Sequence, residues 1–197
     1  KAEDAIDALV RFCRVQPRLP DPAGVTFVPA GEPLGLTPGM SRQAVCERLA
    51  AIRDRNEMAQ LAFHALRDLG RTEALPFLVA AMQRSPVVLK ATEGLTEEEA
   101  AARLAALPGE SIYEGAGRLA QPDEVWTFQR GDGLERLLAL AVVLRERRGD
   151  PRLTIAVEDG RAVLRDAGGK TLHAWPAAKR PRETVWKLDG IPLRGGD

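Results

Sequence analysis

The feature of this sequence that most constrains its fold is the segment Leu137–Leu144, in which every residue is apolar. A helix that is apolar on all sides is stable only where other elements cover all of its sides, so this segment predicts the central helix of a core. Asp132 and Glu135 have the spacing of a capping box, which predicts that the helix begins at about Gly133. Residues 145–148 add positive charge suited to a helix C-terminus, and we expect them to return the helix to solvent.

Short strands are predicted after this helix, over residues 153–157, 161–166, 171–175 and 184–189. Asp159 and Gly160 have the sequence of a type I′ turn, so the first two strands are expected to form a hairpin. A second tight turn is expected at Gly168 and Gly169. One buried helix packed on a short antiparallel β-meander, with further helices before it in the chain, is an α+β fold.

The N-terminal half is predicted to be helical, with an extended connector inside it. Helices are expected over residues 2–15, 41–52, 57–69, 73–83 and 96–107. Prolines recur through residues 17–39, where they break regular structure and leave one short edge strand at 25–28. Residues 110–130 are expected to be mostly loop. We therefore divide the chain into a helical part, residues 1–95, and an α+β part, residues 96–197.

The composition excludes several classes of function. Lys and Arg total 28 and Asp and Glu total 28, and this balance excludes a nucleic-acid binder that works through bulk positive charge. Two cysteines and two histidines are too few for a disulfide framework or a metal-ligand cluster. No apolar run approaches the roughly 18 to 20 residues of a membrane span. The string Gly115–Ala120 has the letters of a dinucleotide fingerprint without the flanking strand and helix, so no cofactor is expected.

Three motifs in the C-terminal part resemble the transglutaminase-like family, which has a papain-like fold. In that family a Gly-Asp-Cys sequence begins an apolar helix, and a His-Ala-Trp strand and a Trp-x-x-Leu-Asp strand follow it. This chain carries similar motifs in the same order, as Gly131-Asp132-Gly133, His173-Ala174-Trp175 and Trp186-Lys187-Leu188-Asp189. The resemblance covers residues 126–190 and implies the same core fold for them.

The resemblance assigns roles to three positions. Gly133 falls where the family has its nucleophilic cysteine, His173 where it has the base, and Asp189 where it has the acid that orients the base. A glycine has no side chain that can attack a substrate, and no spacing links Ser111 or Thr127 to His173. We therefore expect a non-catalytic module that works by binding, or as a structural part, in a larger protein. Most of the 28 basic residues are arginine, which is typical of GC-rich bacterial genes, so we expect that protein to be bacterial.

A ligand cleft is expected where the nucleophile would lie. Trp126 and Trp175 would line it, above the helix N-terminus that Asp132 and Gly133 form. A helix N-terminus favours acidic groups, so the expected partner is a protein or a peptide carboxylate. The alternative roles are core packing for the tryptophans and a half-buried structural position for His173. The sequence indicates neither a compartment nor an oligomeric state.

Two other functions stay open. The first is a hydrolase or transferase with a displaced nucleophile, although Cys13 and Cys46 each lie on the apolar face of a predicted helix, where buried structural thiols are expected. The second is a helical scaffold, because residues 62–76 resemble one HEAT-type helical hairpin. Such a scaffold predicts an exposed apolar groove between residues 57 and 84. Because the sequence opens on Lys1 rather than Met, we expect it to be part of a larger polypeptide.

Overall fold

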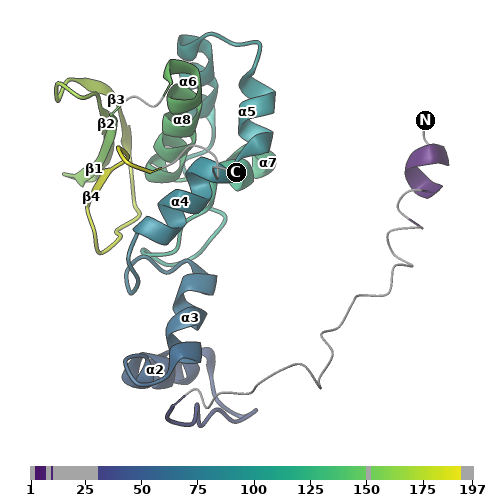
Figure 1. The fold of residues 1–197 in the computed structure, drawn as a ribbon, viewed down its shortest axis with the longest axis vertical. Coiled ribbons are helices and arrows are strands. Elements are labelled where there is room, and N and C mark those ends of the chain that lie inside the picture. Colours follow the sequence, from purple (N-terminus) through teal and green to yellow (C-terminus); the bar gives the residue numbers. More distant parts are fainter. Residues whose placement is uncertain (1–2, 8–9, 11–30, 150–151, 192–197) are drawn as a thin grey trace.

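The computed structural model describes residues 3–7, 10, 31–149 and 152–191. Over these ranges the protein has the predicted α+β fold, with helices packed to one side of a 4-stranded sheet (Figure 1). The helices are α2 (Arg42–Ile52), α3 (Glu57–Leu66), α4 (Leu75–Gln83), α5 (Pro86–Thr92), α6 (Glu97–Ala106), α7 (Pro122–Phe128) and α8 (Gly133–Arg148). The strands are β1 (Thr154–Glu158), β2 (Arg161–Arg165), β3 (Thr171–Pro176) and β4 (Val185–Lys187).

Helix α8 is the central element. It packs against β1, β2 and β3 and against α4 to α7. Every residue of Leu137–Leu144 is at most 1% exposed, which confirms the prediction of a helix covered on all sides. The predicted capping box is also present, since the Glu135 carboxylate accepts the backbone N–H of Asp132 at 2.8 Å. Burial of each such leucine contributes about 1.5 to 3 kcal/mol before the entropic cost is counted.

The last turn of α8 differs from the prediction that it returns to solvent. Arg145 is fully buried, and its guanidinium donates to the Ile191 carbonyl oxygen at 2.6 Å. Arg148 does reach the surface, where it forms an ion pair with Glu97 in the first turn of α6. Gly149 ends the helix with φ of 67°, a left-handed conformation that glycine adopts without strain. The basic C-terminal turn of α8 therefore also binds α6 and the chain near Ile191.

The sheet has the strand order β3-β2-β1-β4, and all neighbours are antiparallel. Asp159 and Gly160 have φ of 47° and 75°, which confirms the predicted type I′ turn between β1 and β2. The fourth strand pairs with β1 and not with β3, so a Greek-key order extends the meander of the first three strands. As a result β3 and β4 lie on opposite edges of the sheet.

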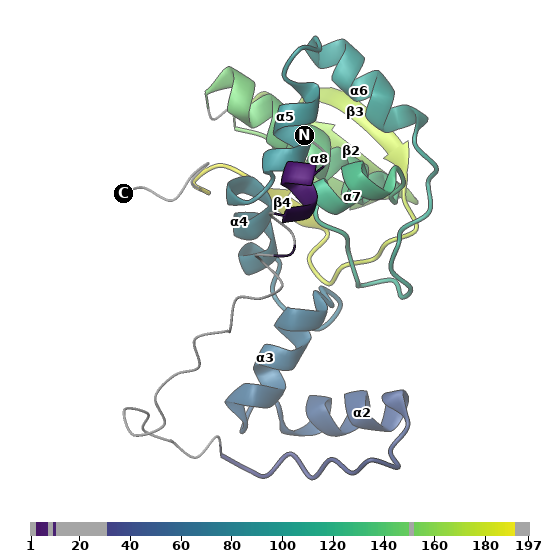
Figure 2. The same ribbon diagram turned by 90° about the vertical axis from the view of Figure 1, so that its right-hand side faces the viewer.

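The described chain has two separate hydrophobic clusters. The larger one lies in what we call the body, the described part of residues 69–191, and surrounds α8. The smaller one lies in what we call the N-terminal lobe, residues 31–66, between α2 and α3; its buried residues are Leu49, Ile52, Ala59 and Phe63. Figure 2 shows this lobe extending away from the body. The lobe and the body therefore do not share one core.

Two helices that the sequence analysis does not predict begin at prolines. Pro86 is the first residue of α5, and Pro122 opens α7 inside a segment predicted to be mostly loop. Proline is favoured at the first helical position, because its missing N–H needs no partner there. The N–H groups of Val87 and Val88 are bound by the Asp123 carboxylate of α7, at 3.0 and 2.9 Å. One short helix therefore caps the other.

Several predictions from the sequence fall outside the described residues. These include the strand at 25–28, Cys13 and most of the helix at 2–15, of which residues 3–7 and 10 are helical. The part of the predicted connector that is described, residues 31–39, contains no helix.

Replacement of Leu140 by alanine tests the central position of α8. The side chain is fully buried, so the variant loses apolar contacts and leaves a cavity, and the free energy of unfolding should fall by about 2 to 5 kcal/mol. Urea unfolding followed by tryptophan fluorescence measures this change. Leu61→Ala is the matched control, because Leu61 is 50% exposed on α3, and it should shift the value by less than about 0.5 kcal/mol. Equal losses in the two variants would contradict the central role of α8.

Candidate functional site

The N-terminus of α8, where the sequence places a ligand cleft, is closed by Asp132. One carboxylate oxygen of Asp132 accepts the N–H of Leu134 at 3.0 Å and so caps the helix. The other accepts the N–H groups of Ala178 and Lys179, at 2.6 and 3.3 Å, in the segment that follows β3. Asp132 is buried. Its two oxygens therefore join the helix to the chain beyond β3 instead of facing a ligand.

Gly133 lies directly against the backbone of β3. A Cβ atom at this position would be 2.1 Å from the carbonyl oxygen of Pro176 and 3.2 Å from that of Trp175. Glycine is needed here because two backbones approach closely. The position that corresponds to the family's nucleophile has no room for a side chain unless β3 moves.

Glu135 and Lys179 form a buried polar network beside Asp132. The Glu135 carboxylate accepts from the Ser111 hydroxyl and from the Ala120 N–H, each at 2.7 Å, while the Lys179 ammonium donates to the carbonyl oxygens of Tyr113 and Gly115. Burial raises the pKa of Glu135 and lowers the pKa of Lys179. The network holds the segment 110–121 over the end of α8.

His173 lies on the edge strand β3, half-buried, with its ring 5.9 Å from that of Trp175. Burial lowers the pKa of His173, and the positive charge of Arg148 lowers it further, whereas Glu98 acts in the opposite direction. Both charged residues belong to the far ends of α8 and α6, away from Gly133. The electrostatic environment of this histidine is therefore set at the end of α8 opposite to the predicted nucleophile position.

Asp189 does not lie beside His173, and the predicted pairing of the two is wrong. His173 is on β3, whereas Asp189 is an exposed residue that follows β4 on the other edge. Two strands lie between them, and neighbouring strands are about 4.8 Å apart, which separates the edges by about 14 Å. The Greek-key order is the physical reason, since β4 pairs with β1.

The two tryptophans of the predicted cleft are half-buried against the core. Trp126 belongs to α7, and Trp175 packs beneath the Arg136 guanidinium, whose carbon lies 5.4 Å from the ring centroid. Arg136 also donates to carbonyl oxygens at the end of α6, including that of Leu107 at 2.9 Å. The structure thus brings Asp132, Gly133 and Trp175 together, but at a packed junction between α8, α6 and β3.

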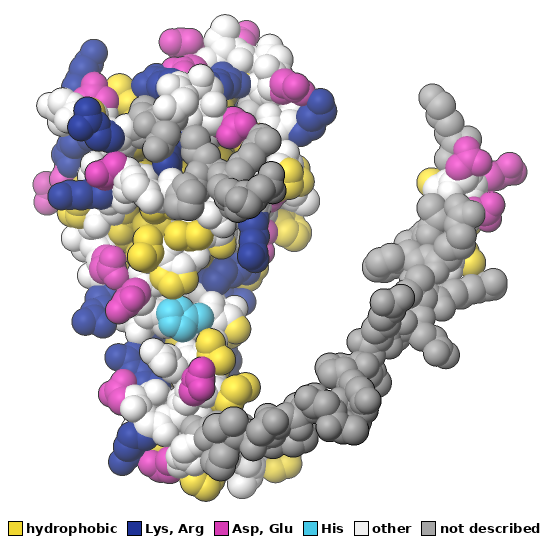
Figure 3. All heavy atoms as spheres, in the orientation of Figure 1, with side chains coloured by type: hydrophobic (Ala, Val, Ile, Leu, Met, Phe, Trp, Pro, Cys, Tyr) yellow, Lys and Arg dark blue, Asp and Glu magenta, His cyan; other side chains and the backbone are white. Residues whose placement is uncertain are grey.

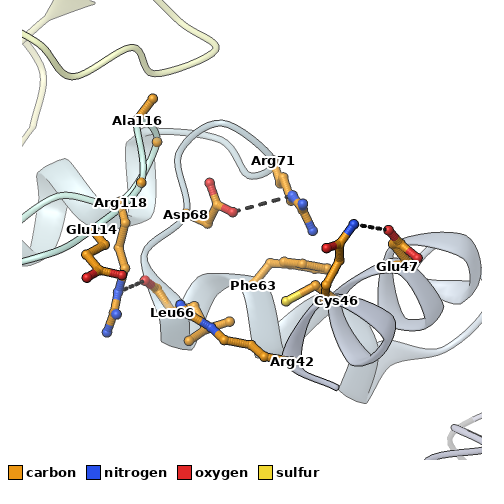
Figure 4. A pocket seen from close by; sticks show the side chains of 13 residues that line it. Arg42, Cys46, Glu47, Phe63, Leu66, Asp68, Arg71, Glu114, Ala116 and Arg118 are labelled. Carbon is orange, nitrogen blue, oxygen red and sulfur yellow. Dashed lines mark hydrogen bonds and ion pairs between the residues drawn. The ribbon is translucent and has the colours of Figure 1, made fainter. Parts of the chain in front are cut away.

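A cavity of about 560 Å³ lies elsewhere, between the N-terminal lobe and the body (Figure 4). We call it the interlobe pocket. Helix α2 contributes Arg42 and Cys46, helix α3 contributes Phe63 and Leu66, and the loop before α7 contributes Glu114 and Arg118. Cys46 is half-buried in this wall and makes no disulfide, so it is a free thiol as predicted but less buried than predicted. The pocket brings together three segments that are far apart in the sequence.

Polar contacts attach the two walls of the pocket to each other. Helix α3 ends at Leu66, earlier than predicted, because Arg67 adopts a left-handed conformation with φ of 54°. The Arg67 guanidinium binds both carboxylate oxygens of Glu124, and the Tyr113 hydroxyl donates to the same carboxylate at 2.6 Å. Arg118 stacks over the Tyr113 ring at 4.1 Å and donates to the Leu66 carbonyl oxygen. This half-buried cluster joins the end of α3 to α7 and to the loop before it, and so links the lobe to the body.

The glycine-containing string at residues 115–120 has a packing role in this link. A Cβ at Gly117 would lie 2.5 Å from the N atom of Gly70 and from a carboxylate oxygen of Asp68. The Gly117 carbonyl oxygen accepts the N–H of Leu69 at 2.8 Å. The sequence reasoning missed the pocket, although this string was the available signal, because closely spaced glycines indicate backbones in contact.

Apolar side chains gather on the face that carries α3 and α4 (Figure 3). Met58 and Leu61 on α3 and Leu75 on α4 are each at least half exposed. The two helices bury their other residues in different clusters, since Phe63 belongs to the lobe and Phe77 to the body. The HEAT-type hairpin suggested by the sequence stays a proposal.

Gly133→Ala tests the closure of the α8 N-terminus. The added methyl group meets the Pro176 carbonyl oxygen, so the free energy of unfolding should fall by at least about 2 kcal/mol. Gly94→Ala is the matched control, because no atom lies within 4 Å of its added Cβ, and its stability should stay within about 0.5 kcal/mol of the wild type. Urea unfolding compares the two. Equal stabilities would contradict the packing of β3 on Gly133.

Glu124→Gln tests the link between lobe and body through its pH dependence. Although burial acts to raise it, the pKa of Glu124 is lowered overall by hydrogen bonds from Arg67 and Tyr113. The ionised form therefore stabilises the fold above the ordinary pKa of 4.5, and this stabilisation is lost as the pH falls through the lowered value.

The Gln variant should thus be less stable than the wild type by about 1 to 3 kcal/mol at neutral pH, with a difference that shrinks in acid. Urea unfolding at a series of pH values measures this difference. Glu110→Gln, at a largely exposed carboxylate paired with Arg130, should show almost no difference at any pH. A constant difference for Glu124→Gln across the series would contradict the role of its charge.

No protein-family model, curated protein or solved structure matches this chain. Within the ranges that the structure describes, no group of three or more His, Cys, Asp and Glu residues could hold a metal ion. In the same ranges no helix is both long enough and apolar enough to cross a membrane. Function must then be inferred from the geometry and chemistry of particular residues, because a fold by itself does not determine it.

Proposed function

We propose that this chain is a non-catalytic, transglutaminase-like binding module of a larger bacterial protein. The observation that carries the proposal is the contact of Gly133 with β3, where a Cβ atom would lie 2.1 Å from the Pro176 carbonyl oxygen. In the family this is the position from which a thiolate attacks, and it must be open to a substrate. Here the backbone of the neighbouring strand fills it.

The surroundings of Gly133 support the same proposal. Both oxygens of Asp132 are engaged by backbone N–H groups, and Asp189 lies on the sheet edge opposite to His173. A nucleophile, a base and an orienting acid must lie within hydrogen-bond reach of one another to act together. Asp132 and Gly133 instead stabilise the junction of α8 with β3 and the segment that follows it.

The interlobe pocket supports a binding role. Its volume of about 560 Å³ lies within the range of roughly 300 to 1,000 Å³ that is usual for small-molecule sites. It is also placed between two parts of the fold with separate cores, as such sites commonly are.

A thiol-dependent enzyme with a displaced nucleophile is the second candidate, and the Cys46 thiol in the pocket wall favours it. Cysteine nucleophiles need a base or a positive environment that yields the thiolate. The pocket wall includes arginines but no histidine among the residues that the structure describes, since His64 on α3 belongs to a different cavity. We therefore give the binding role precedence.

Assays of amide chemistry separate the two candidates. The protein is incubated with a glutamine-containing peptide and a primary amine, and amine incorporation, ammonia release and peptide hydrolysis are measured. The rates should equal the background without protein, both for the wild type and for a variant in which both cysteines are replaced, Cys13→Ser with Cys46→Ser. Turnover by the wild type that disappears in Cys46→Ser would refute the non-catalytic proposal and establish the displaced thiol as the nucleophile.

A further inference from the structure

The interlobe pocket contains charged groups that have no partner. The side chains of Arg42, at the start of α2, and Glu114, on the opposite wall, are exposed and make no hydrogen bond or ion pair with any residue that the structure describes. Two other arginines of the wall are already engaged: Arg71 is paired with Asp68 at 3.4 Å, and Arg118 is stacked on Tyr113. The pocket therefore offers a guanidinium and a carboxylate to a ligand.

The unpartnered groups lie next to an apolar surface. Figure 4 shows Arg42 extending from α2 past Leu66 toward the wall that carries Glu114 and Arg118. Leu66 and the Cys46 side chain, both half-buried, supply the accessible apolar part of the lining, whereas Phe63 is almost fully buried. A guanidinium binds a carboxylate through two parallel N–H···O bonds, and an adjacent apolar surface favours a ligand that has a hydrocarbon or aromatic group close to that carboxylate.

We propose that the interlobe pocket binds a carboxylate that carries an apolar or aromatic side chain, in the form of an amino acid or the last residue of a peptide. Arg42 binds the carboxylate, the side chain of the ligand packs against Leu66 and Cys46, and Glu114 accepts an N–H from the ligand's amine or amide. We choose this ligand class because Arg42 is complementary in charge to the ligand's carboxylate, and Glu114 to its amine or amide N–H. The inference rests on the proposed binding function and names its ligand.

Protection of Cys46 from alkylation tests this assignment. The Cys13→Ser background leaves Cys46 as the single thiol, and N-ethylmaleimide is neutral, so its reaction rate reports access to the pocket. The probes are phenylalanine, N-acetylphenylalanine, N-acetyl-alanyl-phenylalanine and phenylalaninamide. Each is added up to about 10 mM, which nearly fills a site with a Kd of about 1 mM. The three carboxylates should slow alkylation several-fold, and phenylalaninamide should not.

The arms of this experiment also identify the source of the carboxylate. Stronger protection by free phenylalanine, lost in Glu114→Gln, indicates an amino acid, whereas stronger protection by the acetylated dipeptide indicates a peptide C-terminus. Equal protection by phenylalaninamide would overturn the proposal, because the carboxylate would then contribute nothing. Absence of protection by all three carboxylates would overturn it as well.

Variants assign the carboxylate contact to Arg42. Arg42→Ala should raise the Kd of the carboxylate probes about tenfold, since the loss of a charge-assisted hydrogen bond weakens binding by about that factor. Arg103→Ala is the matched control, because it removes the same charge from an exposed position on α6, outside the pocket. Equal weakening in both variants would show a general charge effect and refute the assignment.

The outcome of the alkylation experiment is independent of the outcome of the catalytic assays. Amine incorporation or hydrolysis in the assay above would refute the non-catalytic function, whatever the alkylation rates are. Unprotected Cys46 together with an absence of turnover would refute the ligand class alone and leave the non-catalytic proposal in place.

Discussion

The close approach of α8 to β3 is the constraint on which the rest of the structure depends. A helix as apolar as α8 must be covered on all sides, and the sheet can cover it to its first turn only if two backbones nearly touch there. Gly133 permits that approach, and the Asp132 carboxylate fixes it by binding one N–H group of α8 and two N–H groups of the segment that directly follows β3. The buried Glu135 and Lys179 then hold the loop before α7 over the same junction, and this loop forms one wall of the interlobe pocket.

Local signals in the sequence predict much of this fold, because short-range physics determines them. The apolar run Leu137–Leu144, the capping pair of α8 and the type I′ turn at Asp159 each depend on neighbours within a few residues. The signals for the starts of α5 and α7 are also local, but they are ambiguous because proline can either break a helix or begin one. The carboxylate that caps α5 belongs to Asp123 on another helix, α7. That last contact cannot be derived from the spacing of residues in either segment.

The site was harder to predict, because it depends on which distant segments meet. The placement of β4 beside β1 follows from the path of the chain between β3 and β4, and it separates Asp189 from His173. Asp132, Gly133 and Trp175 do lie close together, as the cleft prediction requires. The backbone of β3, however, occupies the space that the cleft was predicted to fill. The interlobe pocket joins residues near 42, 66 and 116, and no periodicity in the sequence connects them.

The separate cluster of the N-terminal lobe has a consequence for the lifetime of the pocket. The cluster built around Ile52 and Phe63 has far fewer buried residues than the cluster of the body, so among the described residues we expect the lobe to open more readily than the body. Opening of the lobe removes the α2 and α3 walls and with them the cavity. Any molecule that occupies the cavity binds only the closed form, and by mass action it raises the stability of the lobe in proportion to the logarithm of its concentration. Binding of the proposed ligand would therefore be coupled to the folding of residues 31–66.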